Sequence, residues 1–129
     1  MNIVNVQDRG QIANFLRQDV ERYLYELGDL DDFFWPYTTW YASVDTTGIQ
    51  HLALLYRGID PVVLLVQERE NCPMDDFMQA LLPVLPERFY AHLSPGLEQA
   101  LIGRYAVQSH GRHWKMALRQ QSALMAAEV

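Results

Sequence analysis

The residues that could perform acid–base or nucleophilic chemistry are few and scattered along the 129-residue chain. His92 and Ser94 are close enough in sequence to suggest a base and a nucleophile. Pro95 follows Ser94, however, and this order is typical of a helix N-cap, so we predict no catalytic residue. If the chain is active, the candidates for an acid or base are Tyr90, His92 and Tyr105.

Metal-binding patterns are absent from the sequence. The single cysteine, Cys72, excludes an internal disulfide and is interpreted as an inert structural thiol. Asp29, Asp31 and Asp32 could bind a cation or an amine, but a solvated turn is favoured. No ligand spacing connects the histidines with cysteine or carboxylates, so we predict no metal site. These histidines are His51, His92, His110 and His113.

An aromatic group is the strongest candidate for a functional surface. It comprises Phe33, Phe34, Trp35, Tyr37, Trp40 and Tyr41. Aromatic side chains are enriched both in cores and at interfaces, so core packing with an inter-domain or dimer contact is favoured over a ligand pocket. The candidate ligand or interface residues are Trp35, Tyr37, Trp40, Tyr41, Tyr90 and His92.

Charge and hydropathy exclude several function classes. The net charge is −6 and Lys115 is the only lysine, so we expect no nucleic-acid partner. The longest apolar runs, such as 61–66, are too short to span a bilayer, and no membrane partner is expected. One cysteine and no recognisable signal peptide favour a cytoplasmic location.

The elements that must position these residues follow from periodicity and turn signals. The expected strands are 1–6, 37–44, 49–56, 61–67, 88–93, 105–109 and 113–119. One helix or two, capped by Asp8 and interrupted near Asp19, should end at Gly28. Further helices are expected over 74–82 and from Ser94 to Gly103. The run 62–66 does not alternate, which indicates a strand covered on both faces.

Buried helix faces can also be predicted. Val20, Tyr23, Leu24 and Leu27 form one stripe, and Leu97, Ala100 and Leu101 form another. The fold class is therefore α+β, with a mixed, mostly antiparallel sheet of about six or seven strands and helices on both faces. We expect a single domain over 1–119 and a C-terminal tail over 120–129.

This element order resembles the GNAT (GCN5-related N-acetyltransferase) fold over nearly the whole chain. Three local motifs are similar to the N-terminal half of some bacterial two-domain GNAT proteins, in which a degenerate first domain precedes the domain that holds acetyl-coenzyme A. These motifs are Leu27-Gly28-Asp29-Leu30, Thr39-Trp40-Tyr41 and His92-Leu93-Ser94-Pro95-Gly96.

The resemblance implies a loop of the form Arg/Gln-x-x-Gly-x-Gly/Ala after the fourth strand, where glycines let the backbone approach a pyrophosphate. The corresponding stretch, 67–76, has no glycine, and Pro73 removes one N–H donor. It carries four carboxylates: Glu68, Glu70, Asp75 and Asp76. A similar pattern at 108–113 is better read as a hairpin turn at Gly111. We therefore expect no cofactor-binding residues and no acetyl-coenzyme A in this chain.

Three functions remain open from the sequence. The favoured one is a non-catalytic accessory or regulatory domain that packs against a catalytic GNAT domain, either in cis or from a partner. The second is a stand-alone acetyltransferase with an atypical acetyl-coenzyme A site. The third is a small-molecule-binding module or a homodimer that uses the aromatic group.

Overall fold

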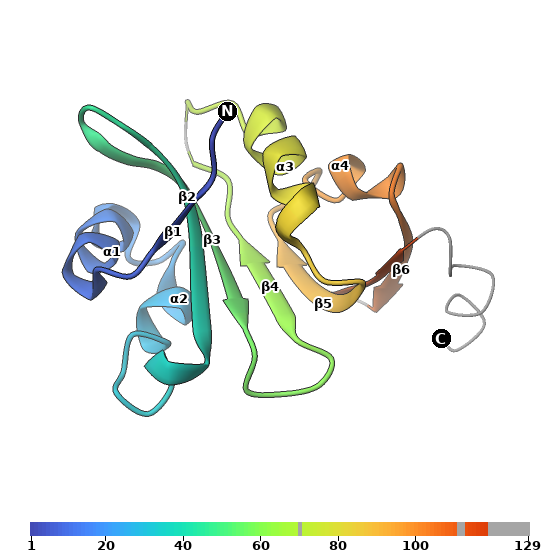
Figure 1. Cartoon of the computed structure of the whole chain (residues 1–129), viewed down its shortest axis with the longest axis horizontal. Helices are drawn as coiled ribbons and strands as arrows, with labels where there is room; N and C mark the ends of the chain where they lie inside the picture. Colours follow the sequence, from blue (N-terminus) through green and yellow to red (C-terminus); the bar gives the residue numbers. More distant parts are fainter. Residues whose placement is uncertain (70, 111–112, 119–129) are drawn as a thin grey trace.

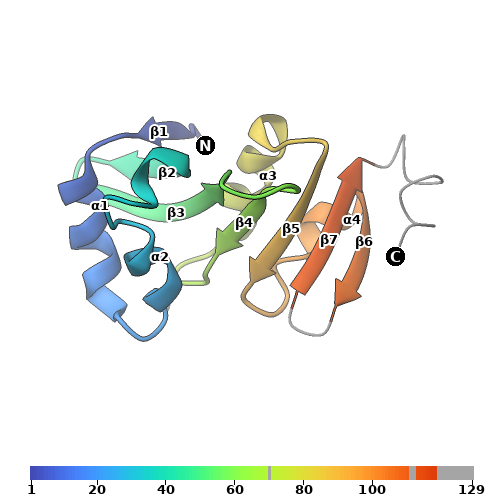
Figure 2. The same cartoon turned by 90° about the horizontal axis from the view of Figure 1, so that it is seen from below.

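A seven-stranded mixed sheet organises the chain. The computed structural model describes residues 1–69, 71–110 and 113–118. The strand order is β1-β2-β3-β4-β5-β7-β6, and every neighbouring pair is antiparallel except β4 and β5 (Figure 1 and Figure 2). The strands are β1 Val4–Val6, β2 Thr38–Asp45, β3 Gly48–Tyr56, β4 Val63–Val66, β5 Arg88–Leu93, β6 Tyr105–His110 and β7 His113–Leu118.

Helices cover both faces of this sheet, as the sequence predicts for an α+β fold (Figure 2). The helices are α1 Arg9–Leu16, α2 Leu24–Gly28, α3 Asp75–Leu81 and α4 Gln99–Ile102. Three 3₁₀ turns cover Arg17–Asp19, Trp35–Tyr37 and Leu82–Val84. The first two helices lie over one face and the last two over the other.

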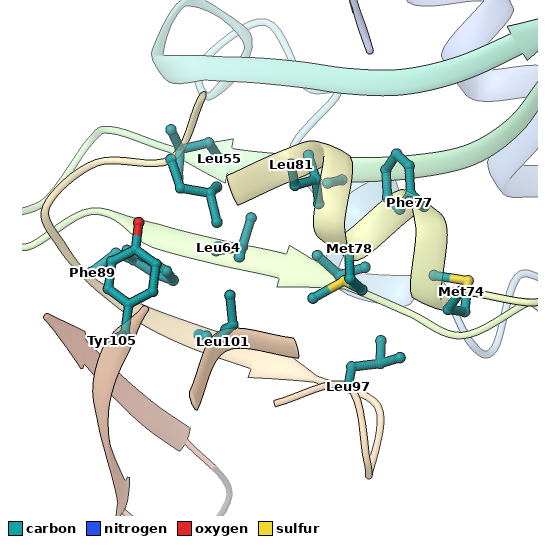
Figure 3. Close-up of a cluster of buried hydrophobic side chains, with 14 residues drawn as sticks. Leu55, Leu64, Met74, Phe77, Met78, Leu81, Phe89, Leu97, Leu101 and Tyr105 are labelled. Atoms are coloured by element: carbon teal, nitrogen blue, oxygen red, sulfur yellow. The ribbon is translucent and has the colours of Figure 1, made fainter. Parts of the chain in front are cut away.

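Alternation along β3 divides the interior into two clusters. Leu54 packs with Ile12 and Leu16 of α1, whereas its neighbour Leu55 packs with α3 and α4 residues such as Leu81. Figure 3 shows the second cluster, in which Leu64 lies between α3 and β5. On β4, Leu64 and Val66 face one cluster while Leu65 faces the other. The prediction that this strand is covered on both faces is therefore confirmed.

The helical segment that ends at Gly28 consists of two helices, α1 and α2. Asp8 caps α1 as predicted, because its Oδ1 accepts a hydrogen bond from the Gln11 N–H at 3.1 Å. The 3₁₀ turn at Arg17–Asp19 then interrupts the helical period before α2 begins.

This break corrects the predicted stripe on α2. Tyr23 is buried and Leu27 packs against the core, but Val20 and Leu24 are exposed. The predicted stripe assumed one continuous helix from Val20 onward. Residues 20–23 instead form turns, so a different side of α2 faces the core. Glu26 takes a buried position instead, at 3% exposure.

The predicted helix from Ser94 to Gly103 begins later than expected. Residues 95–98 form turns in which Gly96 adopts a φ of 95°, and α4 starts only at Gln99. Leu97 and Leu101 are nevertheless buried as predicted. Ser94 is not the helix N-cap, because its hydroxyl is engaged at the end of β4.

The last two strands form the predicted antiparallel pair, with His110 opposite His113. Gly111 and the expected tail over 120–129 lie outside the described residues. Within the described part of the chain, no helix has the length and apolar character needed to cross a membrane.

Candidate functional site

The carboxyl ends of β4 and β5 are the natural place to look for a ligand, because these are the parallel strands of the sheet. A groove of about 620 Å³ lies there. Its lining residues are Asp19, Glu21, Arg22, Gln67, Glu68, Ser94 and Pro95. Three of these seven side chains are carboxylates and one is a cation, so the groove is acidic.

Ser94 closes the seam between the two strands at the floor of the groove. Its N–H donates to the Val66 carbonyl oxygen at 3.2 Å, which extends the parallel pairing by one residue. Its Oγ accepts from the Glu68 N–H at 2.8 Å and donates to Gln67 Oε1 at 3.1 Å. Ser94 is therefore a structural bridge, and its hydroxyl is engaged on both sides.

Arg22 is the cation of the groove, and it is already bonded. Its Nε lies 3.3 Å from Asp19 Oδ2, and its Nη1 donates to the Glu68 carbonyl oxygen. These contacts tie the turn before α2 to the end of β4. The Asp19 carboxylate also offsets positive charge that an anionic ligand would need.

Glu26 lies buried beneath this surface. Its Oε1 has no hydrogen-bond partner within residues 1–69, 71–110 and 113–118, while the Gln67 side chain bonds the carboxyl group. Burial raises the pKa of Glu26 from 4.5 to about 7, and the charge of Asp29 adds to the rise. Its residue type gave no sign of burial, although its position three residues after Tyr23 places it on the same helix face.

His51 organises the connection from β4 to α3. Its Nε2 lies 2.7 Å from the Pro73 carbonyl oxygen, which can only accept, so Nε2 carries a proton. Its Nδ1 lies 2.6 Å from Ser43 Oγ, and its ring stacks on Phe77 at 5.0 Å. His51 is thus a buried, satisfied support for the connection, which the sequence did not indicate.

Cys72 lies beside this histidine, with its Sγ 3.3 Å from His51 Nε2. Because Pro73 already holds that N–H, His51 is not placed to remove the thiol proton. Among the described residues, no group of three or more His, Cys, Asp or Glu side chains could hold a metal ion.

The acidic turn after α2 is stabilised by local contacts. Asp31 Oδ1 accepts from the Phe33 N–H at 2.9 Å, and Asp32 forms an ion pair with Arg9. Burial raises the pKa of Asp29, which faces inward more than the other two. These contacts agree with the predicted structural turn.

The six candidate ligand or interface residues lie in separate parts of the structure. Trp35 stacks on Trp40 with ring centroids 6.4 Å apart, and the Arg9 guanidinium lies 4.7 Å from the Trp35 centroid. Trp40 is buried, and its Nε1 donates to Thr38 Oγ1 at 2.8 Å. Tyr37 lies instead in an exposed edge-to-face contact with Tyr56. Trp40 is therefore a core residue that also lines a surface hollow.

A hollow of about 370 Å³ lies next to the two tryptophans. The segments that line it are the end of β1, the 3₁₀ turn and the start of β2. Its lining residues are Asn5, Val6, Gln7, Trp35, Pro36, Thr38, Thr39 and Trp40.

The other three candidate ligand or interface residues lie on other faces or strands of the sheet. Tyr41 packs against the α3 and α4 cluster, on the face opposite Trp40. Tyr90 and His92 lie on β5, beyond β3 and β4, where they pair with Val63 and Leu65. The six residues therefore do not form one site.

Tyr105, the other candidate acid, is a core residue. It is fully buried, its ring packs edge-on against Phe89, and its hydroxyl donates to the Pro86 carbonyl oxygen at 2.9 Å. Burial also raises the pKa of its hydroxyl. The side chain is therefore inaccessible to an acceptor substrate.

No family model matches the chain, and the comparisons with curated proteins and with solved structures found no match.

Proposed function

We propose that this chain is a non-catalytic, GNAT-like accessory domain that supports a catalytic acetyltransferase domain in cis or in a partner. The strand order and the single parallel pair β4–β5 are compatible with that fold, as are the helices on both faces. Fold analogy does not determine activity, so the proposal depends on the connection where a coenzyme phosphate would bind.

The observation that carries the proposal is the chemistry of residues 67–76. Pro73 has no N–H, the Glu68 N–H is bonded to Ser94, and the Cys72 N–H is bonded to the Arg69 carbonyl oxygen. Arg69 donates to the Gln50 carbonyl and side-chain oxygens at 3.1 and 3.0 Å. Neither these main-chain groups nor this cation is therefore free to hold a diphosphate.

Carboxylates add an electrostatic obstacle. Asp75 and Asp76 lie exposed in the first turn of α3, which has only seven residues. One like-charge contact at ~4 Å costs about 1 kcal/mol in water and more at a drier site. Glu70 lies outside the described residues.

The space next to α3 is also small. A hollow of about 230 Å³ lies between α3 and the turn before α4, with Asp75 and Gly96 in its lining. Sites for drug-sized ligands occupy about 300–1,000 Å³. This hollow is too small to enclose a coenzyme, whereas the larger groove at the carboxyl ends of β4 and β5 is acidic and its one cation is paired with Asp19.

Calorimetric titration with acetyl-coenzyme A tests the non-catalytic part of the proposal. We expect no saturable heat from the wild-type chain. A triple variant with Pro73→Gly, Asp75→Asn and Asp76→Asn should gain measurable affinity, because it restores a donor and removes two charges. Micromolar binding by the wild type would instead favour the stand-alone acetyltransferase, with Tyr90 and His92 as candidates for its acid or base.

The accessory part needs a different test. The gene beyond the codon for Val129 should be sequenced and its open reading frame expressed. We expect a catalytic domain with an Arg/Gln-x-x-Gly-x-Gly/Ala loop, or co-purification with a separate acetyltransferase. A stop codon after Val129, together with no acetyltransferase among the co-purified proteins, would contradict the accessory function.

A small-molecule-binding module is a second candidate, favoured by the hollow next to Trp35 and Trp40. A fragment library screened by ligand-observed NMR should give hits that disappear in Trp35→Ala. Tyr37→Ala is the matched control, because Tyr37 is exposed and does not line the hollow. Hits that persist in Trp35→Ala, or no hits at all, would exclude this function.

A further inference from the structure

The segment 20–30, which contains α2, is held to the sheet by few side chains. Val20, Leu24 and Tyr25 are all exposed. The inward-facing residues are Tyr23, Glu26, Leu27 and Leu30. Arg22 adds a hydrogen bond to the Glu68 carbonyl oxygen at the end of β4. Tyr23 lies against Phe15 of α1 with ring centroids 5.6 Å apart. An acid therefore occupies one of the few positions that attach this segment to the rest of the protein.

The surroundings of Glu26 suit a neutral carboxyl group. Burial is the largest effect and raises the pKa of Glu26, and the Asp29 carboxylate adds to the rise. Hydrogen bonds from the backbone of Glu26 and from the Gln67 side chain at the end of β4 lower this pKa by less. The Tyr23 hydroxyl lies on the same segment. Oε1 has no hydrogen-bond partner among the residues that the structure describes. An ionised Glu26 would thus face a like charge and keep one buried oxygen unsatisfied.

The two arginines of the neighbouring elements are engaged by other groups. Arg22 is paired with Asp19 before α2, and Arg69 after β4 is held by Gln50. From β5, His92 faces the same side of the sheet as Leu65.

Glu26 is also connected to the groove at the carboxyl ends of β4 and β5. Gln67 contacts the Glu26 carboxyl group and accepts a hydrogen bond from Ser94 Oγ. Ser94 Oγ in turn accepts from the Glu68 N–H. A movement of Glu26 away from the sheet would therefore remove one end of a hydrogen-bond chain that crosses the seam between the two strands.

We propose that Glu26 is a proton-controlled latch: its protonated carboxyl holds segment 20–30 on the sheet, and its ionisation releases the segment, whose Glu21 and Arg22 form part of the groove wall. The raised pKa of Glu26, about 7, agrees with this geometry. In the released state the carboxyl group is hydrated and its pKa returns toward 4.5. The equilibrium constant for local opening therefore increases with pH, by about 30-fold between about pH 5.5 and about pH 8.

Hydrogen–deuterium exchange of the full chain measures this opening directly. Exchange rates of the amides in 20–30, corrected for the intrinsic pH dependence, should show the increase in the wild type and none in Glu26→Gln. Glu21→Gln is the matched control, because Glu21 is an exposed acid in the same segment and should keep the wild-type increase. Core strands such as β3 should change much less in all three proteins.

Two results would overturn the latch. One is pH-independent opening of segment 20–30 in the wild type, and the other is an equal increase in Glu26→Gln. If Glu26→Gln does not fold, a carbon-detected NMR titration of wild-type Glu26 replaces it. The midpoint of that titration must then coincide with the midpoint of local opening, and a midpoint near 4.5 would reject the proposal.

Discussion

Replacing Glu26 with glutamine removes a titrating group from the interior while keeping the shape of the side chain. Burial raises the pKa of Glu26 from 4.5 to about 7 in the folded protein. In the unfolded chain the carboxyl group is hydrated and has its ordinary pKa. Between these two values the folded protein holds a proton that the unfolded chain has released. The free energy of unfolding therefore falls as pH rises through this range.

The magnitude follows from the two pKa values. Converted by 2.303RT, the full difference corresponds to about 3 kcal/mol. This stabilisation is present below about pH 4.5 and is lost above about pH 7. Between about pH 5 and about pH 8, the wild type should lose about 2–3 kcal/mol of unfolding free energy through Glu26 alone.

Urea denaturation followed by tryptophan fluorescence can measure this loss, since the buried Trp40 reports on unfolding. The free energy of unfolding is determined at both pH values for the wild type and for Glu26→Gln. Subtracting the two pH differences cancels the contributions of other titrating groups and the fixed cost of burying an amide. We expect a remainder of about 2–3 kcal/mol. A remainder near zero, or one of opposite sign, would refute the argument.

Three further substitutions test other parts of the structure by the same denaturation assay. Ser94→Ala should lower the unfolding free energy by about 0.5–1.5 kcal/mol, because the Glu68 N–H loses its protein acceptor; an unchanged value would contradict the bridge. Leu24→Ser should change the free energy of unfolding by less than about 0.5 kcal/mol because Leu24 is exposed. A larger loss would indicate that Leu24 is buried, as the predicted stripe requires. Tyr105→Phe should cost about 1 kcal/mol through the lost bond to Pro86, and a neutral result would count against that bond.

Much of the fold could be predicted from the sequence because its signals are local. Asp8 caps α1 through a residue three positions away, and Gly28 ends α2 as expected. The uninterrupted apolar run 62–66 predicted a strand covered on both faces. The missing glycine, Pro73 and the acidic residues of 67–76 can be read without any structure. Each signal depends on residue type and near neighbours alone.

Contacts between distant segments decided the rest. Ser94 has the sequence context of a helix N-cap, but it lies directly after β5, beside the end of β4. Its hydroxyl therefore bonds Glu68 and Gln67 instead. Trp40 and Tyr41 are adjacent in sequence, yet the pleat of β2 places them on opposite faces.

Glu26 is the clearest case of a property that only the tertiary structure determined. Its residue type predicts an exposed, charged side chain. The turn after α1 orients α2 so that this side chain meets the sheet. Burial depends on which surfaces meet after the chain has folded, whereas caps and strand patterns depend on neighbours along the chain. The sequence by itself therefore determined the order of the elements, and the tertiary structure decided which of their faces became interior.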